Sequence, residues 1–162
     1  MIIYHGSTVS VEIPAIIKSN RKLDFGEGFY ATSNREQAIR WSWRVASRQK
    51  SGNRIVTEYE FDSETAKKEL QIVRFEKPDE TWLDFVSANR SGLIIPEPYD
   101  IAIGPVADDA VYATILLYEQ GVIDKDTAIK QLKVQKLYDQ IMFHTEKSLQ
   151  YCRYVRHETI GE

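Results

Sequence analysis

Apolar and polar residues follow two different periods along this chain, and each period predicts one type of element. From Arg54 to Phe61 apolar residues alternate with charged ones, with Val56 as the exception, which is typical of a half-buried strand. Ala38, Trp41 and Val45 recur instead at helical spacing. Strands and helices therefore both occur, and they occupy separate stretches of the chain.

The same patterns, together with the turn residues that separate them, predict the other elements. Strands are expected at Ile2–Tyr4, Tyr99–Ile103, Gln140–His144 and Tyr151–Val155, with a strand or turn at Val11–Ile17 and a short β-type run ending Asp24–Thr32. Helices are expected from Ser33 through Arg48, at Asp79–Arg90, at Ala107–Gln120, from Asp124 to about Lys136, and for one or two turns after Thr145.

The start of the first helix carries a specific signal. Ser33-Asn34-Arg35-Glu36 has the spacing of a capping box, so we expect Ser33 to cap the helix and Glu36 to reach back to the Ser33 amide. The mixture of separated strands and helices predicts an α+β fold. Because the chain shows no repeat and no long linker, residues 1–162 are expected to form a single domain.

Charge narrows the choice of partners. The formal net charge is -3, so no general basic field is available to hold nucleic acid, and such a substrate needs a local patch. A local basic stretch does surround the first predicted helix: Arg35, Arg40, Arg44, Arg48, Lys50 and Arg54. Spacings of about four residues are more typical of a solvated helix face, and both interpretations stay open.

The single Cys152 has no partner for an internal disulfide or a structural zinc site, which favours a reducing compartment. His144 and His157 show no metal-ligand spacing with it, so we expect surface or strand positions for both and no metal. The N-terminus lacks a basic segment followed by a long apolar run, and no apolar run approaches the ~20 residues of a membrane span. We therefore expect a cytoplasmic protein with no membrane partner.

Three residues are the leading candidates for chemistry. His5 follows the first strand in Tyr4-His5-Gly6-Ser7, Tyr30 follows a glycine pair in Gly28-Phe29-Tyr30-Ala31-Thr32, and Gln140 opens a late strand. Each has a plain structural alternative. His5 can be a polar residue at a strand end, Tyr30 a core residue, and Gln140 an ordinary first residue of a strand.

Together these segments resemble the His-Tyr-Glu group of ADP-ribosyltransferases, which includes the poly-ADP-ribose polymerase and diphtheria-toxin catalytic domains. Tyr4-His5-Gly6-Ser7 matches the first motif of that group, Gly28-Phe29-Tyr30 matches the second, and Gln140 stands where the third has Glu. The resemblance implies a split β-sheet core with flanking helices. It also implies NAD as co-substrate.

A closer likeness covers nearly the whole chain and is to a bacterial family of unassigned function near these transferases. Similar segments recur there in the same order: Tyr-His-Gly, Asp-Phe-Gly-x-Gly-Phe-Tyr, Trp-Leu-x-Phe, Asn-Arg-x-Gly, Gly-Pro-x-Ala-Asp-Asp and Asp-Gln-x-x-Phe-x-Thr. Members of that family often lie in toxin and antitoxin gene neighbourhoods. The likeness therefore implies a toxin with an antitoxin protein as partner.

The resemblance assigns a role to each site residue. His5 contacts the ribose on the adenine side, the Gly6 backbone pairs with the nicotinamide carboxamide, and the Tyr30 ring stacks on nicotinamide, where an aromatic face adds about 1 kcal/mol. Ser7 binds the same ribose or the carboxamide. The expected catalytic set is His5, Tyr30 and Gln140, and the expected NAD-binding set is Tyr4, His5, Gly6, Ser7, Gly28, Phe29, Tyr30, Asn89 and Arg90.

The glutamine at position 140 changes the expected activity. A Glu places negative charge beside the cation that forms when nicotinamide leaves, whereas Gln140 offers a hydrogen bond and a dipole. Asp139 points to the opposite face of a strand and cannot substitute directly. We therefore expect transfer of a single ADP-ribose to a macromolecular acceptor, protein or nucleic acid. The alternatives are a catalytically silent NAD or ADP-ribose module, a partner-binding module, and a nuclease-type toxin that uses His5 and the basic helix.

Charged residues outside the three motifs are further candidates. Asn89-Arg90 and Asp84 are candidates for the cleft or for target recognition, because Arg suits pyrophosphate, although a cation is also favoured at a helix C-terminus. Asp108-Asp109 form a candidate metal or base pair, but acidic residues are expected in the first turn of any helix. We favour the helix-end interpretation for Asp108 and Asp109.

Overall fold

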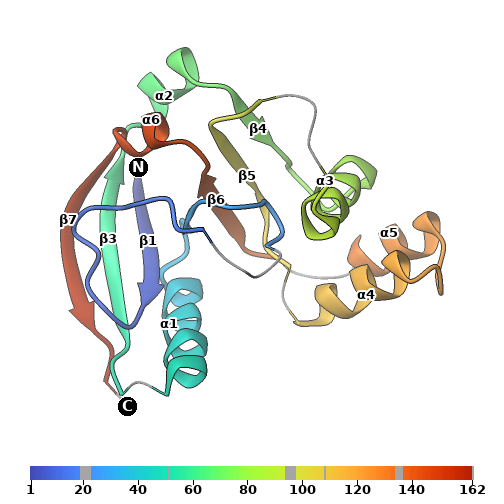
Figure 1. Ribbon diagram of the computed structural model, residues 1–162, viewed down its shortest axis with the longest axis horizontal. Helices are drawn as coiled ribbons and strands as arrows, with labels where there is room; N and C mark the ends of the chain where they lie inside the picture. Colours follow the sequence, from blue (N-terminus) through green and yellow to red (C-terminus); the bar gives the residue numbers. More distant parts are fainter. Residues whose placement is uncertain (19–22, 51, 94–97, 108, 134–136, 162) are drawn as a thin grey trace.

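The computed structural model describes residues 1–18, 23–50, 52–93, 98–107, 109–133 and 137–161 of the chain (Figure 1). The fold is α+β, as predicted. In chain order the elements are β1 (Ile2–Ser7), β2 (Phe29–Ala31), α1 (Arg35–Gln49), β3 (Ile55–Phe61), α2 (Ser63–Glu69), β4 (Ile72–Arg74), α3 (Glu80–Ser91), β5 (Ile101–Pro105), α4 (Asp109–Glu119), α5 (Lys125–Lys133), β6 (Asp139–Phe143), α6 (Glu146–Leu149) and β7 (Cys152–Thr159). Residues 134–136, which were expected to extend α5, lie outside the described residues.

The strands form two sheets that meet at one point. One sheet has three antiparallel strands in the order β1-β3-β7, and the other has four in the order β2-β6-β5-β4, of which β4 and β5 run parallel. Tyr4 on β1 and Thr32, directly after β2, exchange two backbone hydrogen bonds of 2.8 and 3.0 Å. This bridge fixes β1 of one sheet beside β2 of the other.

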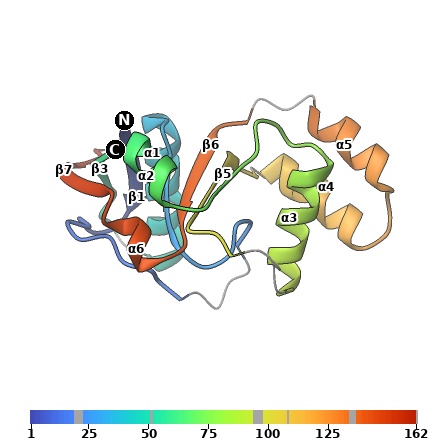
Figure 2. The same ribbon diagram turned by 90° about the horizontal axis from the view of Figure 1, so that it is seen from above.

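Two apolar cores hold the sheets and helices together. The first joins the two sheets and includes Ile3, Tyr59 and Phe143, and the second lies between the four-stranded sheet and helices α3, α4 and α5. Figure 2 shows these helices packed at one end of the molecule, beyond β5 and β6. Neighbouring residues of β6 pack in different cores, because side chains alternate along a strand. Phe143 packs in the first core and Met142 in the second.

Helix α1 lies against β1, and this contact requires a glycine. A Cβ at Gly6 would lie 1.9 Å from the carbonyl oxygen of Ala38 and 2.8 Å from the Ser42 nitrogen. The face of α1 that includes Ala38, Ser42 and Ala46 is buried. Gly6 therefore allows the helix to approach the strand that carries His5.

The predicted capping box is wrong by one residue. Asn34, not Ser33, caps α1, and the Asn34 side chain accepts from the Gln37 amide at 2.9 Å. The Ser33 hydroxyl instead donates to Asp139 at 2.8 Å, and the Ser33 amide also donates to that carboxylate. Asp139 on β6 holds Ser33 outside the helix, which a local motif cannot reveal.

Other boundaries also differ from the prediction. β1 continues past Tyr4 to Ser7, so His5 lies within the strand and pairs with Thr57. Residues 11–17 show bends and no strand. Helix α2 and strand β4 were not predicted, because α2 buries only Ala66 and β4 has three residues, so neither leaves a clear apolar period.

Candidate functional site

A pocket of about 340 Å³ lies where the two sheets and helix α1 come together. Four of the residues predicted for the site line it: His5 and Gly6 from β1, Tyr30 from β2, and Gln140 from β6. Its other walls come from the loop before β2, from α1, from the segment after β5 and from α4: Leu23, Asp24, Trp41, Arg44, Val45, Arg48, Val106, Ala107 and Tyr112. The fold thus brings three motifs that are distant in sequence to one cavity.

His5 is held in one tautomer at the junction of the sheets. Its Nδ1 donates to the carbonyl oxygen of Tyr30 at 2.7 Å, and its ring lies 4.7 Å from the Phe29 ring. Burial lowers the pKa of His5, and the hydrogen bond to Tyr30 opposes this only in part. A neutral ring with its proton on Nδ1 keeps a lone pair on Nε2, so His5 can act as a hydrogen-bond acceptor.

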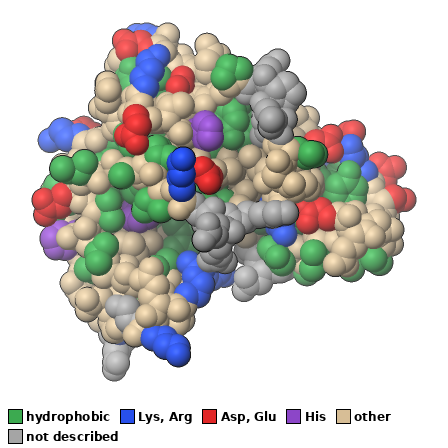
Figure 3. Space-filling model, viewed as in Figure 1, with side chains coloured by type: hydrophobic (Ala, Val, Ile, Leu, Met, Phe, Trp, Pro, Cys, Tyr) green, Lys and Arg blue, Asp and Glu red, His purple; other side chains and the backbone are tan. Residues whose placement is uncertain are grey.

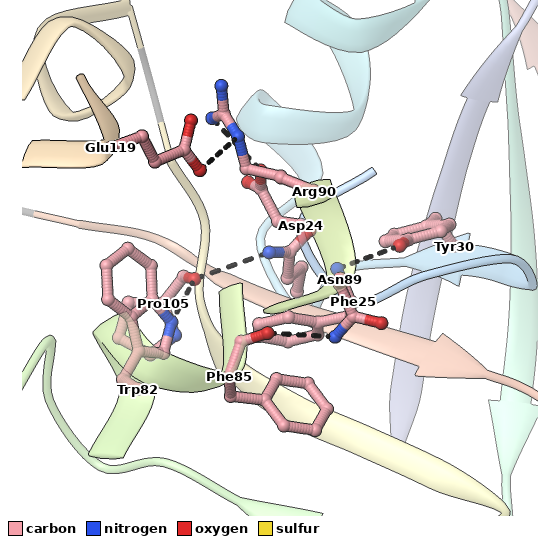
Figure 4. A network of polar contacts seen from close by, with 10 residues as sticks. Asp24, Phe25, Tyr30, Trp82, Phe85, Asn89, Arg90, Pro105 and Glu119 are labelled. Carbon is pink, nitrogen blue, oxygen red and sulfur yellow. Dashed lines mark hydrogen bonds and ion pairs between the residues drawn. The ribbon is translucent and has the colours of Figure 1, made fainter. Parts of the chain in front are cut away.

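The part of Tyr30 that is available to a ligand is its ring and not its hydroxyl. The hydroxyl accepts from the Phe25 amide at 3.2 Å (Figure 4) and donates to the Gly26 carbonyl at 2.6 Å, so both of its partners come from the loop before β2. Burial, followed by the nearby Asp24 charge, raises the pKa of Tyr30 well above its ordinary value. Tyr30 is therefore neutral, and its aromatic face is the part that can bind a planar group.

Gln140 is buried, with 3% of its surface exposed, and its amide is engaged on two sides. Its Nε2 donates to the Pro105 carbonyl at 3.3 Å, an oxygen that also accepts from Trp82 Nε1 at 3.1 Å. The Gln140 side chain also lowers the pKa of the Asp24 carboxylate, which is the effect of a nearby hydrogen-bond donor. The Pro105 carbonyl and the Asp24 carboxylate are both hydrogen-bond acceptors, so this position suits an amide donor. An ionised carboxylate at position 140 would have no proton to donate to either of them.

Asp24 is the site residue that sequence reasoning missed. Its carboxylate lies 3.7 Å from Arg90 Nη1, and its side chain is 18% exposed (Figure 4). Burial raises its pKa to about 6, while Arg90, the Ala107 amide and Gln140 lower it and Glu119 raises it further. Asp24 belongs to the Asp-Phe-Gly segment of the sequence, but an Asp in a glycine-containing turn gives no sign that it reaches Gln140.

Arg90 and Asn89 lie behind the pocket wall instead of lining the pocket. Arg90 is 8% exposed, its Nε lies 3.4 Å from Glu119, and its guanidinium lies 4.2 Å from the centre of the Tyr112 ring. Among the described residues, Arg90 Nη1 has no hydrogen-bond partner. Asn89 donates to the Phe85 carbonyl at 3.1 Å within α3. Arg90 thus compensates buried carboxylates and does not offer its charge to a phosphate in the pocket.

The remaining predicted residues of the first two motifs also lie outside the pocket lining. The Ser7 hydroxyl donates to the Val9 carbonyl at 2.5 Å, and the Tyr4 backbone joins the two sheets. Phe29 is 3% exposed and packs in the first core behind His5. A Cβ at Gly28 would lie 2.3 Å from Met142 Sδ. Close packing of the chain therefore requires a glycine at position 28, as it does at position 6.

The acidic candidates lie elsewhere. Asp84 is exposed on α3 and pairs with Lys125 of α5, at 3.1 Å between Oδ2 and Nζ. Asp108 falls outside the described residues, and Asp109 begins α4, but its side chain is not among those described. Asp139 faces away from Gln140 and binds Ser33, which confirms that it does not replace a carboxylate at position 140.

Two arginines of the predicted basic stretch reach the pocket. Arg44 and Arg48, one helical turn apart on α1, line it beside Trp41 and Val45. Figure 3 shows basic side chains on the surface over α1. The pocket therefore has a basic edge on α1 and a carboxylate, Asp24, on another wall. The apolar residues Trp41 and Val45, which predicted the helix, line the pocket as well.

One comparison places the chain in a family. The model of the family described as "Protein of unknown function (DUF3990)" matches residues 1–154. The chain belongs to this family. Comparison with curated proteins and with solved structures gave no match. In the described part of the chain, no helix has the length and apolar character needed to cross a membrane, and no group of His, Cys, Asp and Glu is arranged to hold a metal ion.

A second cavity, of about 270 Å³, lies on the opposite face of β6. Asp139 and Ile141 line it, whereas Gln140 lines the first pocket, as alternation along a strand requires. None of His5, Tyr30, Asp24 and Gln140 lines this second cavity. The cavity that these four residues share is therefore the candidate site.

Proposed function

We propose that this protein binds NAD in the pocket between the two sheets and transfers one ADP-ribose to a macromolecular acceptor, as the toxin of a toxin and antitoxin pair. The observation that carries the proposal is the meeting of His5, Tyr30 and Gln140 around one cavity of about 340 Å³. These are the residues on which the resemblance to the His-Tyr-Glu transferases rests. The acceptor is a protein or a nucleic acid, and recognition of it would fall to surface loops.

The pocket can hold the nicotinamide half of the dinucleotide. Its volume of about 340 Å³ is at the lower end of the usual range for ligand pockets, about 300–1,000 Å³. The Tyr30 ring would stack on nicotinamide, and His5 Nε2 would accept a hydrogen bond from a ribose hydroxyl. Arg44 and Arg48 at the edge would bind the pyrophosphate, because guanidinium groups pair well with phosphate oxygens.

The chemical step moves positive charge from the ring to the sugar. The bond between the nicotinamide nitrogen and the ribose carbon breaks with its electron pair on nitrogen, so neutral nicotinamide leaves. A nucleophile of the acceptor then bonds to the same carbon and gives its proton to water. The site accelerates this step by holding the dinucleotide rigidly and by stabilising the cation-like sugar.

Labelled NAD tests the activity directly. The purified protein is incubated with NAD labelled in the adenylate half and with bacterial extract, and both label transfer and nicotinamide release are measured. His5→Asn is compared with His157→Asn, which changes an exposed histidine on β7 that contacts Tyr154 outside the pocket. We expect His5→Asn to lose both signals, because it has no acceptor in the place of Nε2, and His157→Asn to keep them. Wild-type protein that gives neither signal would overturn the proposed activity.

A catalytically silent NAD or ADP-ribose module is the second candidate. The amide of Gln140, where the resembling enzymes carry a carboxylate, is the observation that favours it. Calorimetry separates the two candidates, because a silent module binds NAD tightly and releases no nicotinamide. A nuclease has less support, since His144 and His157 both lie outside the pocket and His5 is the one histidine that lines it.

A further inference from the structure

Asp24 and Gln140 form a pair on one wall of the pocket. Gln140 stands where the resemblance expects a carboxylate, and its side chain lowers the pKa of the nearby Asp24. Both side chains line the same cavity as His5 and Tyr30. The pocket therefore holds a negative charge, supplied by the loop before β2 instead of by β6.

Charged groups from several elements surround this carboxylate. Arg90 of α3 faces it at 3.7 Å, and Glu119 of α4 shares the same guanidinium at 3.4 Å. Two carboxylates thus share one cation. The Ala107 amide and Gln140 lower the pKa of Asp24, and the charge of Asp24 raises the pKa of Tyr30 of β2. The other charged or titratable groups that line the pocket are His5, Arg44, Arg48 and Tyr112.

This distribution makes the pocket basic on one side and acidic on the other. Arg44 and Arg48 supply positive charge from α1, and Asp24 supplies negative charge from the loop before β2. NAD has the complementary pattern, because its pyrophosphate is anionic and its nicotinamide ring is cationic. A ligand oriented by these charges places its pyrophosphate along α1 and its ring beside Asp24.

We infer that Asp24 is the carboxylate of this site: it faces the cationic nicotinamide ring of NAD and stabilises the positive charge that passes to the ribose. This inference rests on the proposed NAD-binding function. Gln140 acts as a positioning residue, because its amide lines the same pocket as Asp24 and offers that carboxylate a hydrogen-bond donor. Asp24 thus supplies the negative charge that Gln140 lacks. A glutamine at position 140 is therefore compatible with a site that needs an anion.

The oxidation state of the ligand provides the test. NAD carries a positive charge on its nicotinamide ring and NADH does not, while the rest of the two molecules is the same. Calorimetry measures the affinity for each with the wild type, with Asp24→Asn, and with Asp84→Asn, which removes an exposed carboxylate outside the pocket. We expect the wild type and Asp84→Asn to bind NAD about tenfold more tightly than NADH, and Asp24→Asn to bind both alike.

The outcomes separate the inference from the function on which it rests. If the wild type binds neither dinucleotide, the proposed function fails. If it binds NAD but Asp24→Asn keeps the same preference over NADH, only the role of Asp24 fails. Nicotinamide release by Asp24→Asn should fall about 100-fold, the usual loss when one stabilising group is removed from a transition state.

A measurement on the wild type covers the case in which Asp24→Asn does not fold. The pKa of Asp24 is raised to about 6, so the carboxylate is charged at pH 7.5 and largely protonated at pH 5. The preference for NAD over NADH should therefore decline as the pH falls between these values. Where the pH dependence of stability places the pKa of Asp24 near 6, a preference that is the same at both pH values would overturn the assignment.

Discussion

His5 donates its Nδ1 proton to the backbone carbonyl of Tyr30 at 2.7 Å, across the junction between the two sheets. This one bond does two things. It ties β1 of the three-stranded sheet to β2 of the four-stranded sheet, and it fixes the tautomer that leaves Nε2 as an acceptor. The structural role of His5 belongs to Nδ1, and the role that we propose for it in binding belongs to Nε2 of the same ring.

A substitution at position 5 can separate the roles of the two ring nitrogens. An asparagine at position 5 carries an amide N–H near the place of Nδ1 but has nothing in the place of Nε2. We expect His5→Asn to lower the free energy of unfolding by no more than about 1 kcal/mol and to lose most NAD affinity, whereas His5→Ala loses both. Urea unfolding and calorimetry on the same samples check this. Equal NAD affinity in His5→Asn and the wild type would contradict the role of Nε2.

The raised pKa of Asp24 makes stability depend on pH. Burial holds this pKa at about 6 in the folded protein, against an ordinary value near 3.8. The folded state thus binds the proton more tightly, so this contribution to stability is complete below about pH 4 and is lost as the pH rises through about 6. The loss is at most about 3 kcal/mol.

The comparison with Asp24→Asn isolates this contribution. The difference in unfolding free energy between wild type and variant, measured by urea unfolding from pH 4 to 7.5, should move in favour of the variant as the pH rises. Other titrating groups, including His5, largely cancel in the difference. A difference that stays constant over this range would show that the pKa of Asp24 is close to its ordinary value.

Much of the fold was predictable because its signals are local. The alternation from Arg54 to Phe61 predicted β3 to within one residue of its observed ends, and the apolar spacing of Ala38, Trp41 and Val45 predicted α1 to within two residues. Ser33 shows the limit of local signals. Its hydroxyl binds Asp139, which is 106 positions away, and that contact moves the helix cap to Asn34.

The sequence predicted a residue of the site only where that residue belongs to a recognisable motif. His5, Tyr30 and Gln140 were found through their motifs, and the structure places all three in one pocket. Asp24 was missed because its importance comes from the approach of β6 and α3, which bring Gln140 and Arg90 to it. Arg90 was assigned to the ligand on chemical grounds, yet burial between Asp24 and Glu119 engages its charge inside the protein.

Restoring the expected carboxylate at position 140 should harm the protein at neutral pH. In Gln140→Glu the new side chain faces the Pro105 carbonyl and the Asp24 carboxylate, which are both acceptors. We expect a loss of about 2–4 kcal/mol of unfolding free energy at pH 8. The loss should shrink at pH 5, where the two carboxyl groups can share a proton.

A double variant provides the control for that substitution. Combining Gln140→Glu with Asp24→Asn places an amide opposite the new carboxylate and returns the pair to one donor and one acceptor. Urea unfolding at pH 8 should show the double variant to be more stable than Gln140→Glu alone. If Gln140→Glu is as stable as the wild type at pH 8, Asp24 and Gln140 do not interact as described.

The basic edge of the pocket should bind the phosphates of the ligand. Arg44→Gln and Arg48→Gln should each weaken NAD binding about fivefold to tenfold and reduce its salt dependence, while leaving the much weaker binding of nicotinamide alone unchanged. Arg153→Gln is the matched control, because Arg153 lies on β7 and pairs with Glu60 away from the pocket. Calorimetry at two salt concentrations measures both effects. Equal losses for NAD and nicotinamide would point to a distorted pocket instead.

Gly6 tests whether the contact between α1 and β1 holds the pocket together. In Gly6→Ala the new Cβ would lie 1.9 Å from the Ala38 carbonyl oxygen, and the helix backbone must move away. Overpacking of this kind costs about 3 kcal/mol, and moving α1 displaces Arg44 and Arg48 from the pocket, so stability and NAD affinity should fall together. In Gly52→Ala the added Cβ meets nothing within 4 Å, so this variant should match the wild type in both measurements. A Gly6→Ala variant with wild-type stability would mean that α1 does not lie against β1 as described. In that case α1 would not form a wall of the pocket.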